Sequence, residues 1–445
     1  MKSGKSIPLT IITNILLMGI AVITGSLVAR LLGPEGRGEL AAIQNWAAFI
    51  ALIAAVGLPD AIVYFSGRYS EKSGSYLFSA IILAVLIAAP FIIIGFLLTP
   101  RFLSAQSSET VALAQRYLVI FLLLQATQGM LLHPLRGQSD FSAWNLLRVF
   151  YPLGWLIVIF GAYFFDISSV TYLITGYLIV LGVMAIPIFI IVVRRISSPL
   201  AIQPMTWKPL LKFGLPSVTS AIPQALNLRL DQMIMAAILA PALLGYYTVA
   251  VTWSSGLSPF LLGIAVVAFP TIASKKSRLD QVDSLASSTR IAAFMAILLI
   301  ILLLLITPFG ILLLFGDEFA RSIPVAMVLV IASGISGFSM VLVEGLRGLG
   351  LPQKVIIGQI SGLAFTIFAL VLLLPALGII GAAIASIIGY SVTTLILFYQ
   401  IRRVTESSTS TLLYLRVDDI QLAGRNLRAF LGDFSELIRD KIHKI

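Results

Sequence analysis

About twelve stretches of 20 or more mainly apolar residues fill most of this 445-residue chain. A helix that crosses a membrane needs about 20 such residues, because each residue adds about 1.5 Å of rise. We therefore expect an all-α polytopic membrane protein with about 12 transmembrane helices. The expected spans are 8–32, 39–65, 75–99, 110–134, 143–165, 168–193, 209–238, 243–272, 288–314, 322–343, 353–375 and 378–401.

The composition agrees with this class and excludes several kinds of site. Only 11% of the residues are charged, whereas soluble domains carry about 25%. No cysteine is present, and His133 and His443 are the only histidines, so we expect no disulfide, no metal site and no cofactor. The net charge of +11 would indicate nucleic acid in a soluble protein, but here we assign the cations to cytoplasmic loops and expect no nucleic-acid partner.

Loop charges set the expected orientation. One side of the membrane receives nearly all the cations: Lys2, Lys5, Arg68, Lys72, Arg136, Arg194, Arg195, Lys208, Lys275, Lys276, Arg278, Arg347, Lys354, Arg402 and Arg403. Loops on the other side are short, and their few cations are offset by Glu35, Glu109, Asp317 and Glu318. By the positive-inside rule both termini lie in the cytoplasm.

A helix–turn–helix unit occurs twice in the sequence. LLGPEGRGELAAIQNW in the first half matches the stretch from Asn227 to Trp253, with Pro34 and Pro241, Gly38 and Gly245, and Trp46 and Trp253 each 207 residues apart (241 − 34 = 245 − 38 = 253 − 46). A weaker echo pairs residues 135–137 with 346–348, both Leu-Arg-Gly. Such internal repeats are typical of two-halved transporters.

The repeat predicts how the chain divides. Six spans in each half give both halves the same orientation, which implies a pseudo-twofold axis along the membrane normal. We expect a first bundle at 1–195, a cytoplasmic linker at 196–208, a second bundle at 209–403 and a cytoplasmic tail at 404–445. In the tail Leu427, Leu431, Phe434 and Ile438 recur at helical spacing, which indicates an amphipathic helix or, equally, a weakly ordered segment.

Two charges lie deep in the seventh span. Arg229 is ten residues before Leu239, or about 15 Å from the outer end of its helix, and a charge at that depth needs an explanation. Arg229 and Asp231 are two residues apart, so they do not pair with each other on a helix. We interpret Arg229 as a substrate contact and Asp231 as part of the same cavity, with a structural interhelical pair as the alternative.

Further polar residues extend the expected cavity. Asp60 follows Pro59 in the second span, where it either binds substrate or a coupling ion or satisfies backbone groups freed by the proline. Arg30 and Arg116 lie near helix ends, where they either line a vestibule or reach the headgroups. The uncharged candidates are Asn14, Gln44, Asn45, Gln125, Gln128, Gln224 and Asn227.

Two pairs of residues are candidates for gating. Pro34 and Pro241 mark the duplicated hairpin loops, which we expect to approach each other as an outer gate when a two-halved transporter rocks. Glu344 and Arg347 mark the inner end of the tenth span and form either a helix-end pair or an inner gate. No phosphate-binding glycine loop, metalloprotease motif or nucleophile elbow is present, so we expect no enzymatic activity.

Three segments carry a family resemblance. SLVARLLGPEGRGELAAIQNW, GLPDAIVYFSGR and RLDQMIMAAILAPALLGYYTVAV resemble the polysaccharide-biosynthesis flippases of the multidrug/oligosaccharidyl-lipid/polysaccharide exporter superfamily. The resemblance implies two six-helix bundles in a V and a location in the cell inner (plasma) membrane. It also implies movement of an undecaprenyl-diphosphate-linked oligosaccharide from the cytoplasmic to the outer leaflet, with the sugar in a cationic cavity and the lipid tail in the bilayer.

Alternatives of other classes stay open at this point. A cation-coupled small-molecule exporter of the same superfamily is the second hypothesis, and a membrane glycan polymerase or a non-transporting scaffold follow it. The short outer loops argue against a polymerase. Expected partners are the lipid-linked oligosaccharide and membrane lipids, with a glycan polymerase or glycosyltransferases as further candidates.

Overall fold

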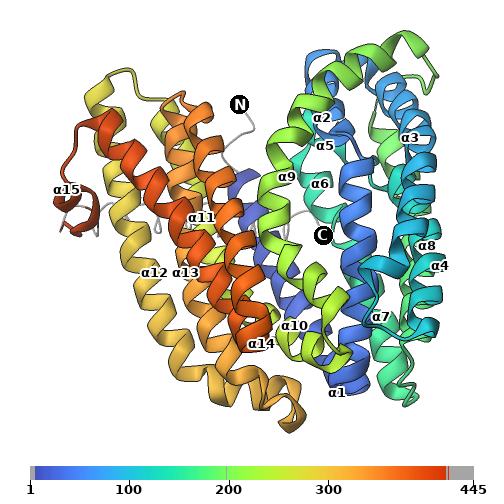
Figure 1. Cartoon of the computed structure of the whole chain (residues 1–445). Coiled ribbons are helices and arrows are strands. Elements are labelled where there is room, and N and C mark those ends of the chain that lie inside the picture. The colour runs from blue at the N-terminus through green and yellow to red at the C-terminus, as the bar shows by residue number, and fades with distance from the viewer. Residues whose placement is uncertain (1–5, 197, 417–418, 420–445) are drawn as a thin grey trace, which may run out of the picture. The chain divides into compact units, whose positions relative to one another are not determined.

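Helices form along nearly the whole chain because a backbone inside hydrocarbon must satisfy its own hydrogen bonds. In the computed structural model (Figure 1) the described residues are 6–196, 198–416 and 419, without the side chains of 6–8, 11, 218–221, 223–225, 227 and 228. The described part contains only helices, turns and irregular segments. The fold is therefore all-α, as the sequence predicts.

Eight α-helices precede the predicted linker. They are α1 (Ser6–Ala54), α2 (Leu58–Arg68), α3 (Ser73–Phe102), α4 (Ser108–Gln128), α5 (His133–Gly137), α6 (Phe141–Leu147), α7 (Phe150–Phe164) and α8 (Val170–Arg195), with the 3₁₀ turn η1 (Ser70–Lys72) between α2 and α3.

Seven more α-helices follow the predicted linker. They are α9 (Trp207–Ile238), α10 (Pro241–Ser254), α11 (Ser258–Ala273), α12 (Arg278–Phe315), α13 (Ser322–Gly348), α14 (Pro352–Thr405) and α15 (Thr409–Leu413), with the 3₁₀ turns η2 (Pro204–Thr206), η3 (Ser255–Leu257) and η4 (Asp317–Phe319).

These helices account for twelve membrane crossings. Nine segments of the described chain are long and apolar enough to span a bilayer. Two of them, α1 with 49 residues and α14 with 54, are long enough for two crossings each, since about 20 residues suffice for one. Both bend at a glycine with positive φ: Gly33 at 63° and Gly378 at 58°. With α9 as a further crossing, the sum is 9 + 2 + 1 = 12, which confirms the predicted number.

The second predicted span differs from one continuous helix. The chain leaves α1 at Ala54 and begins α2 at Leu58, with Val56 and Gly57 at φ 49° and 67° between them. A Cβ on Gly57 would lie 2.1 Å from the carbonyl oxygen of Gly214 in α9, so the break brings two backbones into contact. Pro59 then occupies the first turn of α2, where its missing N–H costs no hydrogen bond. The segment predicted as the span 39–65 is thus interrupted between Ala54 and Leu58.

The chain packs into two units, each described by itself. One consists of Gly19–Thr248, and the other of Met1–Met18 with Val249–Ile445. Within the first unit α9 packs against α2 and α3, so the seventh span lies with helices of the predicted first half. These are packing units of one structure, and the predicted halves at 1–195 and 209–403 stay a prediction.

A short C-terminal segment belongs to the second unit. Leu412 of α15 is fully buried in an apolar cluster with Leu285, Leu346 and Ile401. Arg290 of α12 donates from Nε to Asp419 Oδ2 at 2.5 Å and from Nη2 to Oδ1 at 2.7 Å, and both side chains are buried. This segment therefore folds back onto α12. The amphipathic positions predicted between Leu427 and Ile438 lie outside the described residues.

Candidate functional site

The two duplicated hairpins contact each other inside the unit Gly19–Thr248. A Cβ on Gly38 would lie 1.8 Å from the carbonyl oxygen of Pro241, and a Cβ on Gly245 would lie 1.9 Å from that of Pro34. No side chain fits at either position. The contact is reciprocal: the glycine of each hairpin packs against the proline of the other, and the two glycines, like the two prolines, are 207 residues apart. The hairpins predicted as an outer gate thus lie together in this structure, and their opening stays a prediction.

Local sequence explains how the hairpins form. In α1 the positive φ of Gly33 turns the chain, and Pro34 begins the next helical arm. In the second copy α9 ends at Ile238 and Pro241 begins α10. The loop after α3 holds the end of α9: Ser104 Oγ donates to Ala237 O at 2.8 Å and Gln106 Nε2 to Ala236 O at 3.0 Å. These bonds satisfy carbonyls that a helix end leaves open.

A polar network connects α1 and α9 within the same unit. Arg229 Nη1 donates to Asn45 Oδ1 at 3.1 Å, and Asn45 Nδ2 donates to Gln232 Oε1 at 2.8 Å. Asn45 is therefore bound on both sides of its amide. The structure thus brings together two residues predicted for the cavity, Arg229 and Asn45, and adds Gln232.

Arg229 is the exposed end of this network. Its side chain is exposed, and no carboxylate in the described part of the chain forms an ion pair with it. α9 ends nine residues later at Ile238 (238 − 229 = 9), which corresponds to about 14 Å along the helix. The structure therefore shows a cation at depth, with one amide to orient it and with free donors.

Asp231 has a different environment from Arg229. It is 6% exposed, and its carboxylate accepts hydrogen bonds from the Tyr247 hydroxyl in α10 and from the Gln232 backbone N–H. The carboxylate is thus buried in this structure, and a place for Asp231 in the cavity beside Arg229 stays a prediction. In this structure the residue links α9 to α10 just below the hairpin contact.

Asp60 lies at the start of α2 and is exposed. Ser217 Oγ of α9 donates to its Oδ2 at 2.5 Å. The carboxylate therefore joins α2 to α9, which supports the structural alternative weighed for this residue. A contact with substrate stays a prediction.

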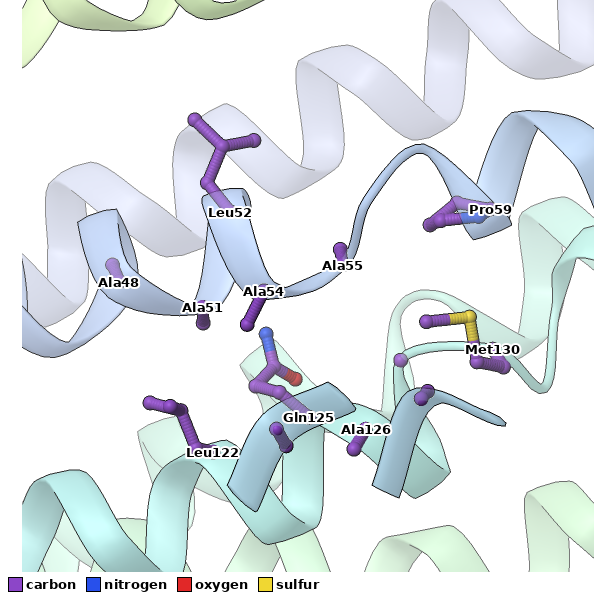
Figure 2. A pocket seen from close by; sticks show the side chains of 13 residues that line it. Ala48, Ala51, Leu52, Ala54, Ala55, Pro59, Leu122, Gln125, Ala126 and Met130 are labelled. Atoms are coloured by element: carbon purple, nitrogen blue, oxygen red, sulfur yellow. The ribbon is translucent and has the colours of Figure 1, made fainter. Parts of the chain in front are cut away.

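Gln125 and Gln128 form a pair of their own, separate from the hydrogen bonds of the Arg229 network. Gln128 Nε2 donates to Gln125 Oε1, and Gln125 lines a cavity of about 260 Å³ between α1, α3 and α4. Figure 2 shows its amide among alanine side chains of α1, with Leu122 and Met130 nearby. This small cavity is almost entirely apolar.

The other predicted site residues are spread over the structure. Arg30 and Arg116 are exposed on α1 and α4, and Gln44 is half-buried beside Asn45. Asn14 belongs to the other packing unit. Gln224 and Asn227 lie on α9, and their side chains are outside the described part. Their contribution to a cavity stays a prediction.

Glu344 and Arg347, the candidates for an inner gate, form an ion pair within one helix. Arg347 Nη1 donates to Glu344 Oε1 at 2.8 Å near the end of α13. A pair three residues apart on a helix is the helix-end arrangement. A gating role for it stays a prediction.

Two residues of the network escaped the sequence analysis. Gln232 follows Asp231 directly and is itself an amide inside an apolar span, so the depth criterion applied to the other amides would have found it. Tyr247 belongs to the duplicated segment, but a tyrosine in a span gives no sign that its hydroxyl meets a carboxylate.

Comparison with known proteins gives a consistent result. Residues 3–276 match the family described as polysaccharide biosynthesis protein. The chain is 24% identical over 404 residues to the probable low-salt glycan biosynthesis flippase Agl15 of Haloferax volcanii, covering 86% of this chain and 80% of that one.

Solved structures share the fold at low sequence identity. Lipid II flippase MurJ in an inward closed conformation superposes with a TM-score of 0.74 at 16% identity, covering 98% of this chain and 99% of that one. An inward-facing multidrug resistance MATE transporter of the MOP superfamily gives 0.68 at 18% identity, covering 88% and 94%.

Proposed function

The chain belongs to the polysaccharide biosynthesis protein family, and from this premise we propose that it is a flippase for a lipid-linked oligosaccharide. It takes the undecaprenyl-diphosphate-linked glycan from the cytoplasmic leaflet of the inner membrane and releases it in the outer leaflet by alternating access. Both termini lie in the cytoplasm in this proposal. The name of the Haloferax volcanii relative, a glycan biosynthesis flippase, supports the substrate class.

The observation that carries the proposal is the exposed guanidinium of Arg229. A diphosphate that leaves water for the interior of a membrane protein needs a fixed positive charge. Arginine stays ionised and offers paired donors that match phosphate oxygens. In this chain Arg229 has no carboxylate partner among the described residues and is steadied by Asn45.

The neighbouring groups fit the rest of the substrate. Amides such as Asn45 and Gln232 both donate and accept hydrogen bonds, as sugar hydroxyls do. The lipid tail stays in the bilayer, so it needs no enclosed pocket. The hairpin contact at Gly38 and Gly245 closes the outer side while the glycan enters from the cytoplasm.

A cation-coupled small-molecule exporter is the second candidate. The MATE transporters share the fold, and the apolar lining of the cavity beside Gln125 suits a small apolar molecule. The two candidates differ in what accumulates when the protein is lost.

The decisive experiment deletes the gene and examines both the cell surface and the membrane lipids. A glycan flippase predicts loss of surface glycan together with accumulation of complete lipid-linked units on the cytoplasmic side. A small-molecule exporter predicts normal surface glycan and greater sensitivity to toxic compounds. Loss of a polymerase would leave single units on the surface, and normal glycan with normal sensitivity would reject both transport proposals.

A further inference from the structure

A polar cleft lies where α2 and α5 end, at the opposite end of the unit Gly19–Thr248 from α10 and the hairpin contact (Figure 1), among loops that carry Arg68, Lys72 and Arg136. Its volume is about 520 Å³. The side chains that line it are Ser66, Ser70, Glu71, Gln138 and Ser139, and two glycines complete it. No apolar side chain lines it, in contrast to the cavity beside Gln125.

The two glycines let α2 and α5 approach each other at the base of the cleft. A Cβ on Gly137 would lie 2.5 Å from Val63 O, and one on Gly67 would lie 2.9 Å from Gly137 O. Gln138 Nε2 donates to Ser73 Oγ at 2.9 Å and so fixes the rim. The shape of the cleft is therefore set by backbone contacts and not by mobile side chains.

The duplicated copy of this junction provides an internal comparison. There Gly348 takes the place of Gly137: its Cβ would lie 3.2 Å from Phe269 O and 2.9 Å from Ile272 Cβ, as that of Gly137 lies 3.0 Å from Ser66 Cβ. By these contacts Ser66 corresponds to Ile272. By the 211-residue offset Gln138 corresponds to Leu349, and Ser139 corresponds to Gly350. Only the first copy is polar at all three positions.

Two of the polar residues are unfavourable for folding. Ser139 has a φ of 60°, whereas its counterpart Gly350 has 77°, and a residue other than glycine is strained in this region. Ser66 is fully buried, and its hydroxyl oxygen has no hydrogen-bond partner among the described residues, which is costly. Glycine and alanine would suit these positions better if the junction were only structural.

The lining indicates which chemistry the cleft accepts. Arg68, Lys72 and Arg136 flank the cleft without lining it, and Glu71 is the one charged side chain in its lining. Together with the carbonyl end of α2, Glu71 disfavours a phosphate inside the cleft. Hydroxyl donors from a ligand can meet the carboxylate and the carbonyls, and its oxygens can accept from the serines. Neutral groups that both donate and accept hydrogen bonds are those of a sugar.

We propose that this cleft is a saccharide subsite, in which the glycan of the lipid-linked substrate docks before transport. The inference rests on the proposed function and deepens it, because it separates recognition of the sugar from recognition of the diphosphate at Arg229. Ser139 and Ser70 are exposed and receive the ligand, while Ser66 forms the floor.

The first test uses variants that should stabilise the fold. Ser139→Gly removes backbone strain and Ser66→Ala removes an unsatisfied hydroxyl, so both should keep or raise the melting temperature. Ser139→Gly should nevertheless lower glycan export at limiting substrate by about five-fold, the equivalent of one lost hydrogen bond. Ser66→Ala is the matched control, because its hydroxyl is fully buried and does not reach the ligand, and it should export normally. Unchanged export in Ser139→Gly would overturn the subsite, because a purely structural junction would tolerate the change.

The second test measures occupancy directly in the full-length chain, which has no native cysteine. Ser139→Cys is labelled with a maleimide in permeabilised membranes that contain or lack the lipid-linked glycan. At a glycan concentration about twice its dissociation constant, labelling should slow about three-fold. Gly350→Cys, at the exposed matched turn, should label at the same rate in both membranes.

Equal rates at Ser139→Cys in the two membranes reject the subsite. Slowing of Gly350→Cys to the same degree as Ser139→Cys would also reject the subsite, because it would show that the glycan slows labelling in general. The gene deletion separates this outcome from failure of the proposed function. If export requires the protein but protection is absent, only the subsite fails, whereas export without the protein removes the basis of both.

Discussion

The indole Nε1 of Trp46 donates a hydrogen bond of 2.9 Å to Oγ1 of Thr99. The same bond joins Trp253 and Thr307, also at 2.9 Å. Each threonine in turn donates to the carbonyl four residues earlier, Gly95 or Leu303, and each precedes a proline. The first pair lies in the unit Gly19–Thr248 and the second in the other unit. The repeat is therefore present in side-chain contacts as well as in sequence.

The repeated bond predicts two matched effects on stability. Thr99→Val and Thr307→Val each leave an indole N–H without its acceptor, at a cost of about 1–3 kcal/mol. The two pairs share no partner, so the double variant should show the sum of the single effects within about 0.5 kcal/mol. Thermal unfolding in detergent measures this, with Thr→Ser at each site as the control that keeps the acceptor.

Sequence reasoning reached the fold because its main signals are local. Apolar length predicted twelve crossings, and the 207-residue offset found Pro34, Gly38 and Trp46 with their counterparts. Sequence reasoning did not find the threonine pair, because its offset is 208 (307 − 99) and a Thr-Pro dipeptide alone does not predict a hydrogen bond to a tryptophan. The break at Gly57 also escaped it, because that break depends on contact with Gly214 of a distant helix.

The site was predicted less completely than the fold. Depth along the seventh span singled out Arg229, which is exposed in the structure, and its contact with substrate stays a prediction. Depth cannot tell which way a helix faces. Asp231, two residues away, is buried against Tyr247, and only packing between α9 and α10 determines this.

Arg229→Ala should abolish glycan export while the protein accumulates normally. The described structure gives this side chain one amide contact and no ion pair, so folding does not depend on it. Arg229→Lys should keep part of the activity, because the charge survives without the paired donors. Export is measured as surface glycan and abundance by immunoblot.

Arg321→Ala is the matched control for Arg229, since Arg321 is exposed and lies outside the site. It should export normally. If Arg229→Ala also exports normally, the residue does not bind the diphosphate. If Arg229→Ala fails to accumulate, its role is in folding.

Gly38→Ala tests the hairpin contact. The new methyl group would lie 1.8 Å from the carbonyl oxygen of Pro241, so the hairpins must separate. We expect reduced export, and faster labelling of a cysteine at Leu243 from outside. Gly245→Ala should act in the same way through Pro34, whereas Gly263→Ala, with no atom within 4 Å of its Cβ, should change neither. Normal export with normal labelling in both hairpin variants would reject the gate.

The pair between Arg290 and Asp419 makes docking of the C-terminal segment dependent on pH. Burial raises the pKa of the Asp419 carboxyl, but hydrogen bonds from Arg290, Ser287 and the Arg416 backbone outweigh this and lower the pKa from 3.8 to about 2. Because the pKa in the folded protein lies below the value in the unfolded chain, the pair stabilises docking above about pH 4. That stabilisation should disappear as the pH falls from about 4 to about 2.

Asp419→Asn should reproduce the acid effect at neutral pH. It leaves the buried Arg290 guanidinium without its counter-charge, and breaking such a pair costs about 3–5 kcal/mol. We expect a lower melting temperature and faster proteolysis after α15, with little further change on acidification to pH 3. Asp283→Asn, on an exposed carboxylate of the same helix, should behave as the parent protein. The double variant Arg290→Leu with Asp419→Leu should recover much of the loss, because no unpaired charge stays buried. If Asp419→Asn unfolds at the parent temperature and still loses stability in acid, the pair does not hold the segment and another carboxylate carries the pH dependence.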